Sequence, residues 1–134
     1  MATTTTRERG DRITRAASII RRVGSIERWA DDRKSVQSEY GGSIYETRPH
    51  RCTCPDQRRT QGICKHMLAA YAPQLVALVL KMRAAYSLAE LRDVATFYSA
   101  AMTDLPMGYR QLARDEYRTA CNRIVTRIAY AEVA

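Results

Sequence analysis

Four residues within one short stretch have the types and the spacing of metal ligands. A Cys-x-Cys pair, Cys52 and Cys54, is followed after nine residues by a Cys-x-His pair, Cys64 and His66. Three thiolates and one imidazole are a donor set that structural zinc prefers, and four protein ligands leave no open coordination position for catalysis. We therefore predict one structural Zn²⁺ held by these four side chains.

Other assignments of the same residues stay open at this point. His50 lies two residues before Cys52 and is the main rival to His66 as the nitrogen ligand. A Cys-x-Cys pair can also form a strained, reducible disulfide, which would make the cluster a redox sensor, and the pattern can arise by chance. Cys121 lies on the apolar side of a predicted helix far along the chain, so we exclude it as a ligand and expect a buried thiol.

The ligands need elements that bring the two pairs together. Cys52 and Cys54 are expected on a bent segment where a hairpin ends, and Pro55 directly after them supports the bend. The spacer is rich in loop-forming types, which predicts a loop. Cys64 is expected just before a helix with His66 in its first turn, so that amide donors and the helix dipole point toward the thiolates.

Short segments rich in β-branched and aromatic residues precede the cluster. Residues 34–39 and 43–48 are predicted strands of a hairpin, because a Gly41-Gly42 pair between them suits a tight turn. A hairpin alone is marginal in water and must pack on something. The side chains that we expect in the core or as cross-strand partners are Trp29, Val36, Ile44 and Tyr45.

The rest of the chain is predicted to be helical. Residues 11–23 have apolar positions at helical spacing, with Asp11 as a cap and Gly24 beyond the end. Pro73 should break the helix that follows His66. The next helix should begin at a capping box of Ser87 and Glu90, with one apolar face made of Leu88, Leu91, Val94, Ala95, Tyr98 and Met102. A last helix begins near Asp104 and Pro106, with a long apolar stripe made of Tyr109, Ala113, Tyr117, Ala120, Ile124 and Ile128.

The spacing and its flanking residues resemble a known family. The pattern CxC-x9-CxH, together with SVQS, SIYET, CTCPD and CKHMLA, is similar to the SWIM-type zinc finger over roughly residues 28–71. The resemblance implies a short β-hairpin that leads to a zinc-bound turn and a helix. It also implies binding to DNA or to proteins, as is thought of members of this family. We therefore expect an α+β fold with a flexible N-terminus at 1–9, a helix plus zinc finger at 10–72 and a helical extension at 73–134.

The charge of the chain favours a polyanionic partner. The 134 residues include 22 Lys and Arg against 14 Asp and Glu, which gives a net charge of +8, and most of the excess lies in the half that contains the cluster of Cys52, Cys54 and Cys64. Basic proteins gain affinity for nucleic acid through counterion release. We predict a non-enzymatic module that binds nucleic acid, most of all DNA. The cations assigned to this contact are Arg51, Arg58, Arg59, Lys65, Arg12, Arg15 and Arg22.

Two other interpretations of these features are kept. The chain could be a structural or adaptor subunit of a larger protein or ribonucleoprotein assembly, and the cations could neutralise the zinc-thiolate centre. The long stripe of the last helix could close its own bundle, or bind a protein partner or a second copy of the chain. The side chain of Arg110 borders this stripe, as do those of Arg114 and Arg118.

The sequence lacks the signals of several other classes of protein. It has no phosphate-binding loop and no motif of paired carboxylates, so we expect neither an enzyme nor a small-molecule substrate. It has no apolar run of about 18 residues that could span a membrane, and its start lacks the apolar core of a secretory signal. We expect a cytoplasmic protein, associated with the nucleoid in a bacterium or nuclear in a eukaryote, whose thiols are free or metal-bound.

Overall fold

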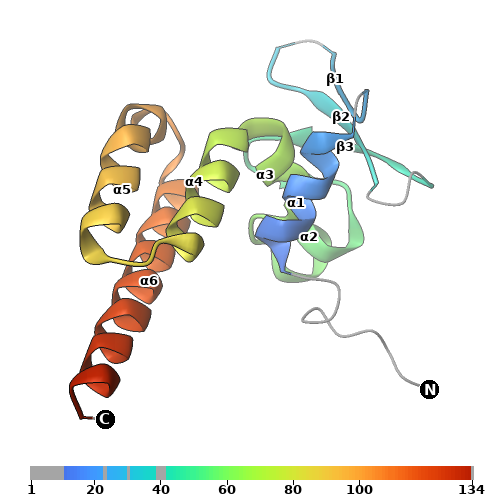
Figure 1. Ribbon diagram of the computed structural model, residues 1–134. Coiled ribbons are helices and arrows are strands. Elements are labelled where there is room, and N and C mark those ends of the chain that lie inside the picture. Colours follow the sequence, from blue (N-terminus) through green and yellow to red (C-terminus); the bar gives the residue numbers. More distant parts are fainter. Residues whose placement is uncertain (1–10, 23, 30, 39–41, 134) are drawn as a thin grey trace, which may run out of the picture. The chain divides into compact units, whose positions relative to one another are not determined.

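A computed structural model describes residues 11–22, 24–29, 31–38 and 42–133 (Figure 1). The chain divides into two compact units, residues 1–76 and residues 77–134. The fold is α+β, as the sequence predicted. The predicted flexible start at 1–9 and Gly41 of the predicted turn lie outside the described residues. In chain order the elements are α1 (Arg12–Arg21), β1 (Ile26–Arg28), β2 (Lys34–Gln37), β3 (Ile44–Arg48), β4 (Arg51–Cys52), α2 (Pro55–Thr60), α3 (Lys65–Tyr71), α4 (Pro73–Ala84), α5 (Leu88–Thr103) and α6 (Met107–Val133).

The first unit contains an antiparallel sheet with the strand order β1-β2-β3-β4. The predicted hairpin forms its centre, where Val36 of β2 pairs with Tyr45 of β3. Two short outer strands, which the sequence analysis did not predict, extend the sheet on both sides. On the side that leads to the metal ligands, Thr47 of β3 pairs with Cys52 of β4, so the first ligand is fixed by the register of the sheet.

Helix α3 is the central element of the first unit, because it packs on α1 and on the strands β2, β3 and β4. Helix α1 begins at the predicted cap, where the Asp11 carboxylate accepts a hydrogen bond from the Thr14 amide at 3.1 Å. The side chains that fill the space between these elements are apolar and almost fully buried. They are Ile13, Ala16, Ala17, Ile19, Val36, Met67, Leu68 and Ala69.

Two of the side chains expected in the core or as cross-strand partners are exposed, although Ile44 does pair across the sheet with Gln37. Ile44 is 70% exposed and Trp29 is 58% exposed. Successive side chains of a strand point to opposite faces, and Tyr45 contacts α3 through the ring of His66, so Ile44 points away from the helix. Trp29 lies just beyond the end of β1, where its amide donates to the Arg33 carbonyl at 3.1 Å, and no element covers its ring.

Hydrogen bonds from side chains fix the end of α3 against the sheet. The Lys34 ammonium donates to the Ala70 carbonyl at 2.7 Å and lies 4.9 Å from the centre of the Tyr71 ring. The Tyr71 hydroxyl donates to the carbonyl of Thr47 at 2.7 Å and also to that of Asp32. Burial raises the pKa of Tyr71 above its ordinary value. The C-terminal end of α3 is therefore held against the sheet.

The second unit consists of helices. Pro73 begins α4 and Ser87 caps α5, where its hydroxyl accepts the Glu90 amide at 3.1 Å, as the sequence predicted. Arg83 of α4 makes a paired contact with Glu116 of α6, at 2.5 and 3.2 Å. The buried core of this unit is made of Leu78, Val79, Met82, Leu91, Tyr109, Ala120 and Ile124.

Two residues of the predicted apolar faces differ from expectation. Leu88 and Ile128 are each 45% exposed, because they lie near helix ends, where α5 starts and where α6 continues beyond its last buried residue, Ile124. Within the described residues, no single helix is both long and apolar enough to cross a membrane. Helices α3 and α4 together reach the required length and apolarity, but the chain bends sharply between them.

Candidate metal centre

The four predicted ligands are carried by the ends of three consecutive elements. Cys52 ends β4, and Cys54 is the residue that precedes α2. The chain then passes through α2 and returns, and Cys64 precedes α3 with His66 in its first turn. The metal centre therefore lies at a junction between a strand and two helix starts, as the spacing of the ligands predicted for the second pair.

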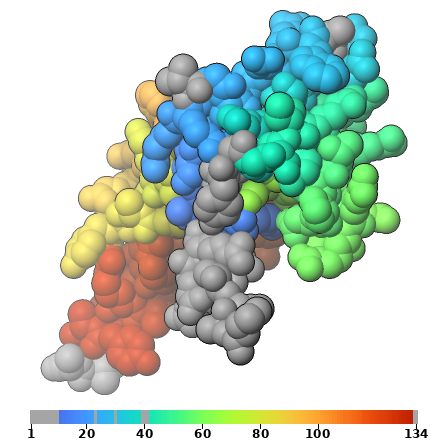
Figure 2. Space-filling view, turned by 90° about the vertical axis from the view of Figure 1, so that its right-hand side faces the viewer, coloured from blue at the N-terminus to red at the C-terminus, as the bar shows by residue number. Residues whose placement is uncertain are grey.

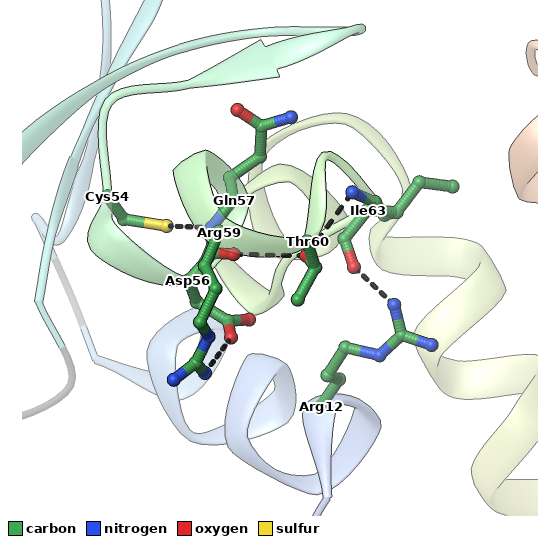
Figure 3. Close-up of polar contacts among 8 residues, drawn as sticks. Arg12, Cys54, Asp56, Gln57, Arg59, Thr60 and Ile63 are labelled. Carbon is green, nitrogen blue, oxygen red and sulfur yellow. Dashed lines mark hydrogen bonds and ion pairs between the residues drawn. The ribbon is translucent and has the colours of Figure 1, made fainter.

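The spacer between the two pairs is a short helix, where the sequence analysis expected a loop. Pro55 occupies the first turn of α2, where proline is well tolerated, and the Cys54 sulfur accepts a hydrogen bond from the Gln57 amide at 3.4 Å (Figure 3). Gln61 ends the helix in a left-handed conformation with φ of 54°, which turns the chain back toward Cys64.

The four side chains form one compact, buried cluster. Their ligand atoms all lie within 4.8 Å of one another, and none of the four residues is more than 4% exposed. The distance from the Cys64 sulfur to Nδ1 of His66 is 3.8 Å. In a tetrahedral zinc site with bonds of about 2.3 Å to sulfur and about 2.0 Å to nitrogen, neighbouring ligand atoms lie roughly 3.5 to 3.8 Å apart. The cluster is therefore consistent with Zn²⁺.

The imidazole of His66 has the surroundings of a ligand. Its ring packs against Tyr45, with ring centres 4.7 Å apart and planes at 52°, which fixes its orientation. Its Nε2 is buried and has no hydrogen-bond partner in the part of the chain that the structure describes. A buried polar atom without a partner is costly in an apolar site. Either ring nitrogen, Nδ1 beside the Cys64 sulfur or the unpartnered Nε2, can supply the one nitrogen ligand beside the three sulfurs, so the residues present fit a metal ion.

The three sulfurs interact strongly with one another even without a metal ion, and this changes the pKa of each thiol. Hydrogen bonds from Cys52 and Cys64 hold the pKa of Cys54 well below its usual range, and the contact with Cys54 raises the pKa of Cys52. A hydrogen bond from Cys52 lowers the pKa of Cys64, but the contact with Cys54 and burial outweigh it and raise this pKa to about 11. Zinc binds thiolates, so its entry must release the protons of Cys52 and Cys64.

Two residues considered in the sequence analysis stand apart from this cluster. His50, the rival nitrogen ligand, is exposed in the turn between β3 and β4, and the cluster does not include it. Cys121 lies on α6 and also stands outside the cluster, but its thiol is only half-buried, contrary to the expectation of a buried one. The sequence analysis expected more burial from the position of Cys121 on the apolar side of a long helix. That expectation was too high, because the apolar stripe of α6 is covered only in part.

Four of the seven predicted nucleic-acid contacts surround the metal centre. Arg51 lies on β4 directly before Cys52, and Arg58 and Arg59 lie on α2; all three are exposed. Arg59 forms an exposed ion pair with Asp56 at 3.1 Å (Figure 3). Lys65, the fourth, is the first residue of α3 and is half-buried. These side chains are placed by the same elements that carry the ligands.

The other three predicted contacts lie on α1 or at its end. The Arg12 guanidinium donates to the Ile63 carbonyl at 2.5 Å, which joins α1 to the segment before Cys64 (Figure 3). The Arg22 guanidinium donates to the Ser38 carbonyl at the end of the hairpin. Arg15 is half-buried on α1. The sequence analysis did not foresee the internal bonds of Arg12 and Arg22, because no local signal marks a long-range contact between a side chain and a carbonyl.

Comparison with known proteins agrees with the geometry. Residues 40–72 match the SWIM zinc finger family, a span that contains all four residues of the cluster. No curated protein and no solved structure matches the chain.

Proposed function

Because residues 40–72 are a SWIM zinc finger domain, we propose that the protein is a non-enzymatic zinc module that binds nucleic acid, DNA above all, through the basic side chains around its metal centre. The observation that supports this most is the exposure of Arg51 and Arg58 beside the cluster. Within the described residues, neither guanidinium has a hydrogen bond or an ion pair. We further propose a location in the cytoplasm, associated with the nucleoid, for a bacterial protein, or in the nucleus for a eukaryotic one.

These cations stand on an accessible face of the first unit. Figure 2 shows the segment from β3 to α2, coloured from teal to green, at the surface of one side of this unit. The segment from β3 to α2 carries Arg51 and Arg58 as well as Arg48, which is also exposed. A nucleic-acid backbone attracts such a group through its phosphates, and these contacts carry no base specificity. The proposal therefore concerns a positioning surface, without sequence preference.

The dependence of binding on salt tests the proposal. Fluorescence anisotropy on labelled duplex DNA, single-stranded DNA and RNA gives an affinity at each salt concentration. If duplex phosphates are contacted by both residues, the double variant Arg51→Ala/Arg58→Ala should flatten the slope of log affinity against log salt by about 1.8, at about 0.9 for each lost contact. Zinc content should not change, since neither residue is a ligand.

A matched control removes the same charge from the second unit. Arg92 and Arg118 are exposed residues of α5 and α6, and their double replacement by Ala should leave the slope near that of the unmodified protein. An unchanged slope in the Arg51/Arg58 variant would exclude this surface as the site. Equal flattening in both variants would show an effect of net charge alone.

A second function is favoured by a separate observation on the helical unit. Large apolar side chains are exposed on α6, where Val125 and Ile128 are three residues apart and therefore lie on one face of the helix. Neighbouring exposed apolar side chains are found at contacts with other proteins, so we also propose an adaptor role in which the helical unit binds a protein partner or a second copy. Light scattering over a range of concentrations tests self-association. A protein without salt-dependent nucleic-acid binding would make the adaptor role the leading proposal.

A further inference from the structure

The helical unit contains a pocket that the metal centre and the basic surface do not use. It has a volume of about 350 Å³ and is formed by one side each of α4, α5 and α6. Its apolar wall includes Leu78 and Met82 of α4 and Met102 of α5. All of its lining residues belong to residues 77–134, so the pocket is part of one compact unit. Its size falls in the range of small-molecule sites, roughly 300 to 1,000 Å³.

Two arginines of α6 line this mainly apolar pocket, whose other polar residues are Ser99, Thr103 and Tyr117. Arg110 and Arg114 are one helical turn apart, and the lining contains no carboxylate. The Nε of Arg110 is buried and has no hydrogen-bond partner within the described residues. The nearest acidic residue along α6 on the α4 side, Glu116, is bound by Arg83. The pocket thus combines the buried, unpartnered Nε of Arg110 with the exposed guanidinium of Arg114 and a mainly apolar wall.

We propose that this pocket binds a small organic acid, with its carboxylate on Arg110 and Arg114 and its apolar body against the side chains of α4 and α5. A guanidinium presents parallel donors that match a carboxylate, and such charge-assisted bonds are the strong ones. An inorganic anion would leave the apolar wall without a partner. A neutral apolar molecule would leave the Arg110 Nε without one. Only a ligand with both parts satisfies the whole lining.

This inference does not depend on the proposed nucleic-acid function, and it adds a ligand that the sequence did not predict. The residues of the pocket come from three helices, and in the sequence they are spread from position 78 to position 117. Arg110 and Arg114 look there like ordinary surface charges at helical spacing. Only the packing of α4, α5 and α6 shows that they border one cavity.

Three molecules with eight carbon atoms each and different head groups separate the parts of the proposal. Titration calorimetry with the zinc-loaded full chain compares octanoate, 1-octanol and octylamine, each below the concentration at which it self-associates. Octanoate should bind at least about tenfold more tightly than octanol, as expected for the loss of one charge-assisted contact, and octylamine should not bind. Equal binding of octanoate and octanol would overturn the role of the arginines.

Variants then locate the binding. Arg110→Gln should weaken octanoate binding by about tenfold or more, and Ala113→Leu, which adds a side chain inside the pocket, should abolish it. Arg118→Gln is the matched control, because Arg118 is exposed on the same helix outside the lining. Helical circular dichroism shows that each variant is folded. If Arg110→Gln fails this check, Arg114→Gln takes its place.

Two results would refute the proposal. One is octanoate binding that Arg110→Gln and Ala113→Leu both leave unchanged in folded protein, since the ligand would then lie elsewhere. The other is saturable binding of an acidic amphipathic peptide with none of octanoate, because the groove would then be a protein-docking surface. Nucleic-acid binding is measured independently, so its loss or presence does not affect either result.

Discussion

Replacing Cys64 by serine should release the metal and unfold the first unit. The four side chains of the cluster are each at most 4% exposed and join β4 to the starts of α2 and α3. Zinc contributes about 10 to 16 kcal/mol of apparent free energy in small fingers, whereas a whole domain is stable by about 5 to 15 kcal/mol. The contribution of the metal is therefore as large as the whole net stability that is usual for a domain, and its loss should unfold this unit.

The size of the expected change follows from the helices involved. Helices α1, α2 and α3 have 10, 6 and 7 residues, and α4, α5 and α6 have 12, 16 and 27. If only the first unit unfolds, as local stability differences allow, the helical signal at 222 nm should fall by roughly 30%. Chelation of the metal from the unmodified protein should produce the same fall.

Elemental analysis, circular dichroism and thermal melting measure this outcome. The unmodified protein should hold one zinc per chain, Cys64→Ser should hold none, and Cys121→Ser should keep the metal and the full helical signal. A Cys64→Ser protein with one zinc and an unchanged melting curve would refute the ligand assignment. Equal metal loss in the Cys64 and Cys121 variants would refute it as well, because Cys121 lies outside the cluster.

Three further predictions concern stability. Because the pKa of Tyr71 is raised in the folded state, the stability that its neutral hydroxyl contributes is complete below the ordinary pKa of about 10 and is lost as pH rises through the folded-state pKa. The free energy of unfolding measured with urea should therefore fall in alkali, and Tyr71→Phe should reduce that fall. Glu116→Gln, which removes the ion pair with the partly exposed Arg83, should cost about 1 kcal/mol, and a change within error would show that the ion pair is only a surface contact. Trp29→Ala should change stability by less than about 0.5 kcal/mol, whereas Val36→Ala should cost about 2 kcal/mol; equal costs would restore Trp29 to the core.

Local signals with a direct physical cause predicted much of the fold. Asp11 and Ser87 are caps because their side chains accept the amides that a helix start leaves free. Pro73 begins a new helix because it cannot continue the previous one. The spacing of the cysteines and His66 was sufficient to predict the cluster, because three thiols and an imidazole rarely occur so close together in a sequence without binding a metal.

The features that the sequence did not predict depend on neighbours in space. Helix α2 has six residues and is capped by the sulfur of Cys54, and cysteine is not among the usual cap residues. The outer strands β1 and β4 have three and two residues, too few for an alternating pattern. Trp29 and Ile44 have apolar side chains, but the register of the sheet and the end of a strand leave them exposed.

The metal centre is surrounded by more positive charge than is needed to neutralise it. Zinc with three thiolates and a neutral imidazole carries a net charge of −1, and part of that charge is met by the backbone. The Gln57 amide donates to the Cys54 sulfur, and Cys54 and Cys64 each precede a helix start, where the dipole favours negative charge. The exposed guanidiniums of Arg51 and Arg58 are not required for this balance.

The remaining cations of this unit divide by what they contact. Arg12 and Arg22 bind carbonyls of their own chain, and Arg59 binds Asp56, so each of these has a structural use. An exposed arginine without such a contact adds little to the stability of the fold. Its guanidinium stays hydrated until the groups of a partner replace the water. This difference, more than the net charge of +8, is why Arg51 and Arg58 are the residues whose replacement should distinguish a nucleic-acid surface from a merely basic protein.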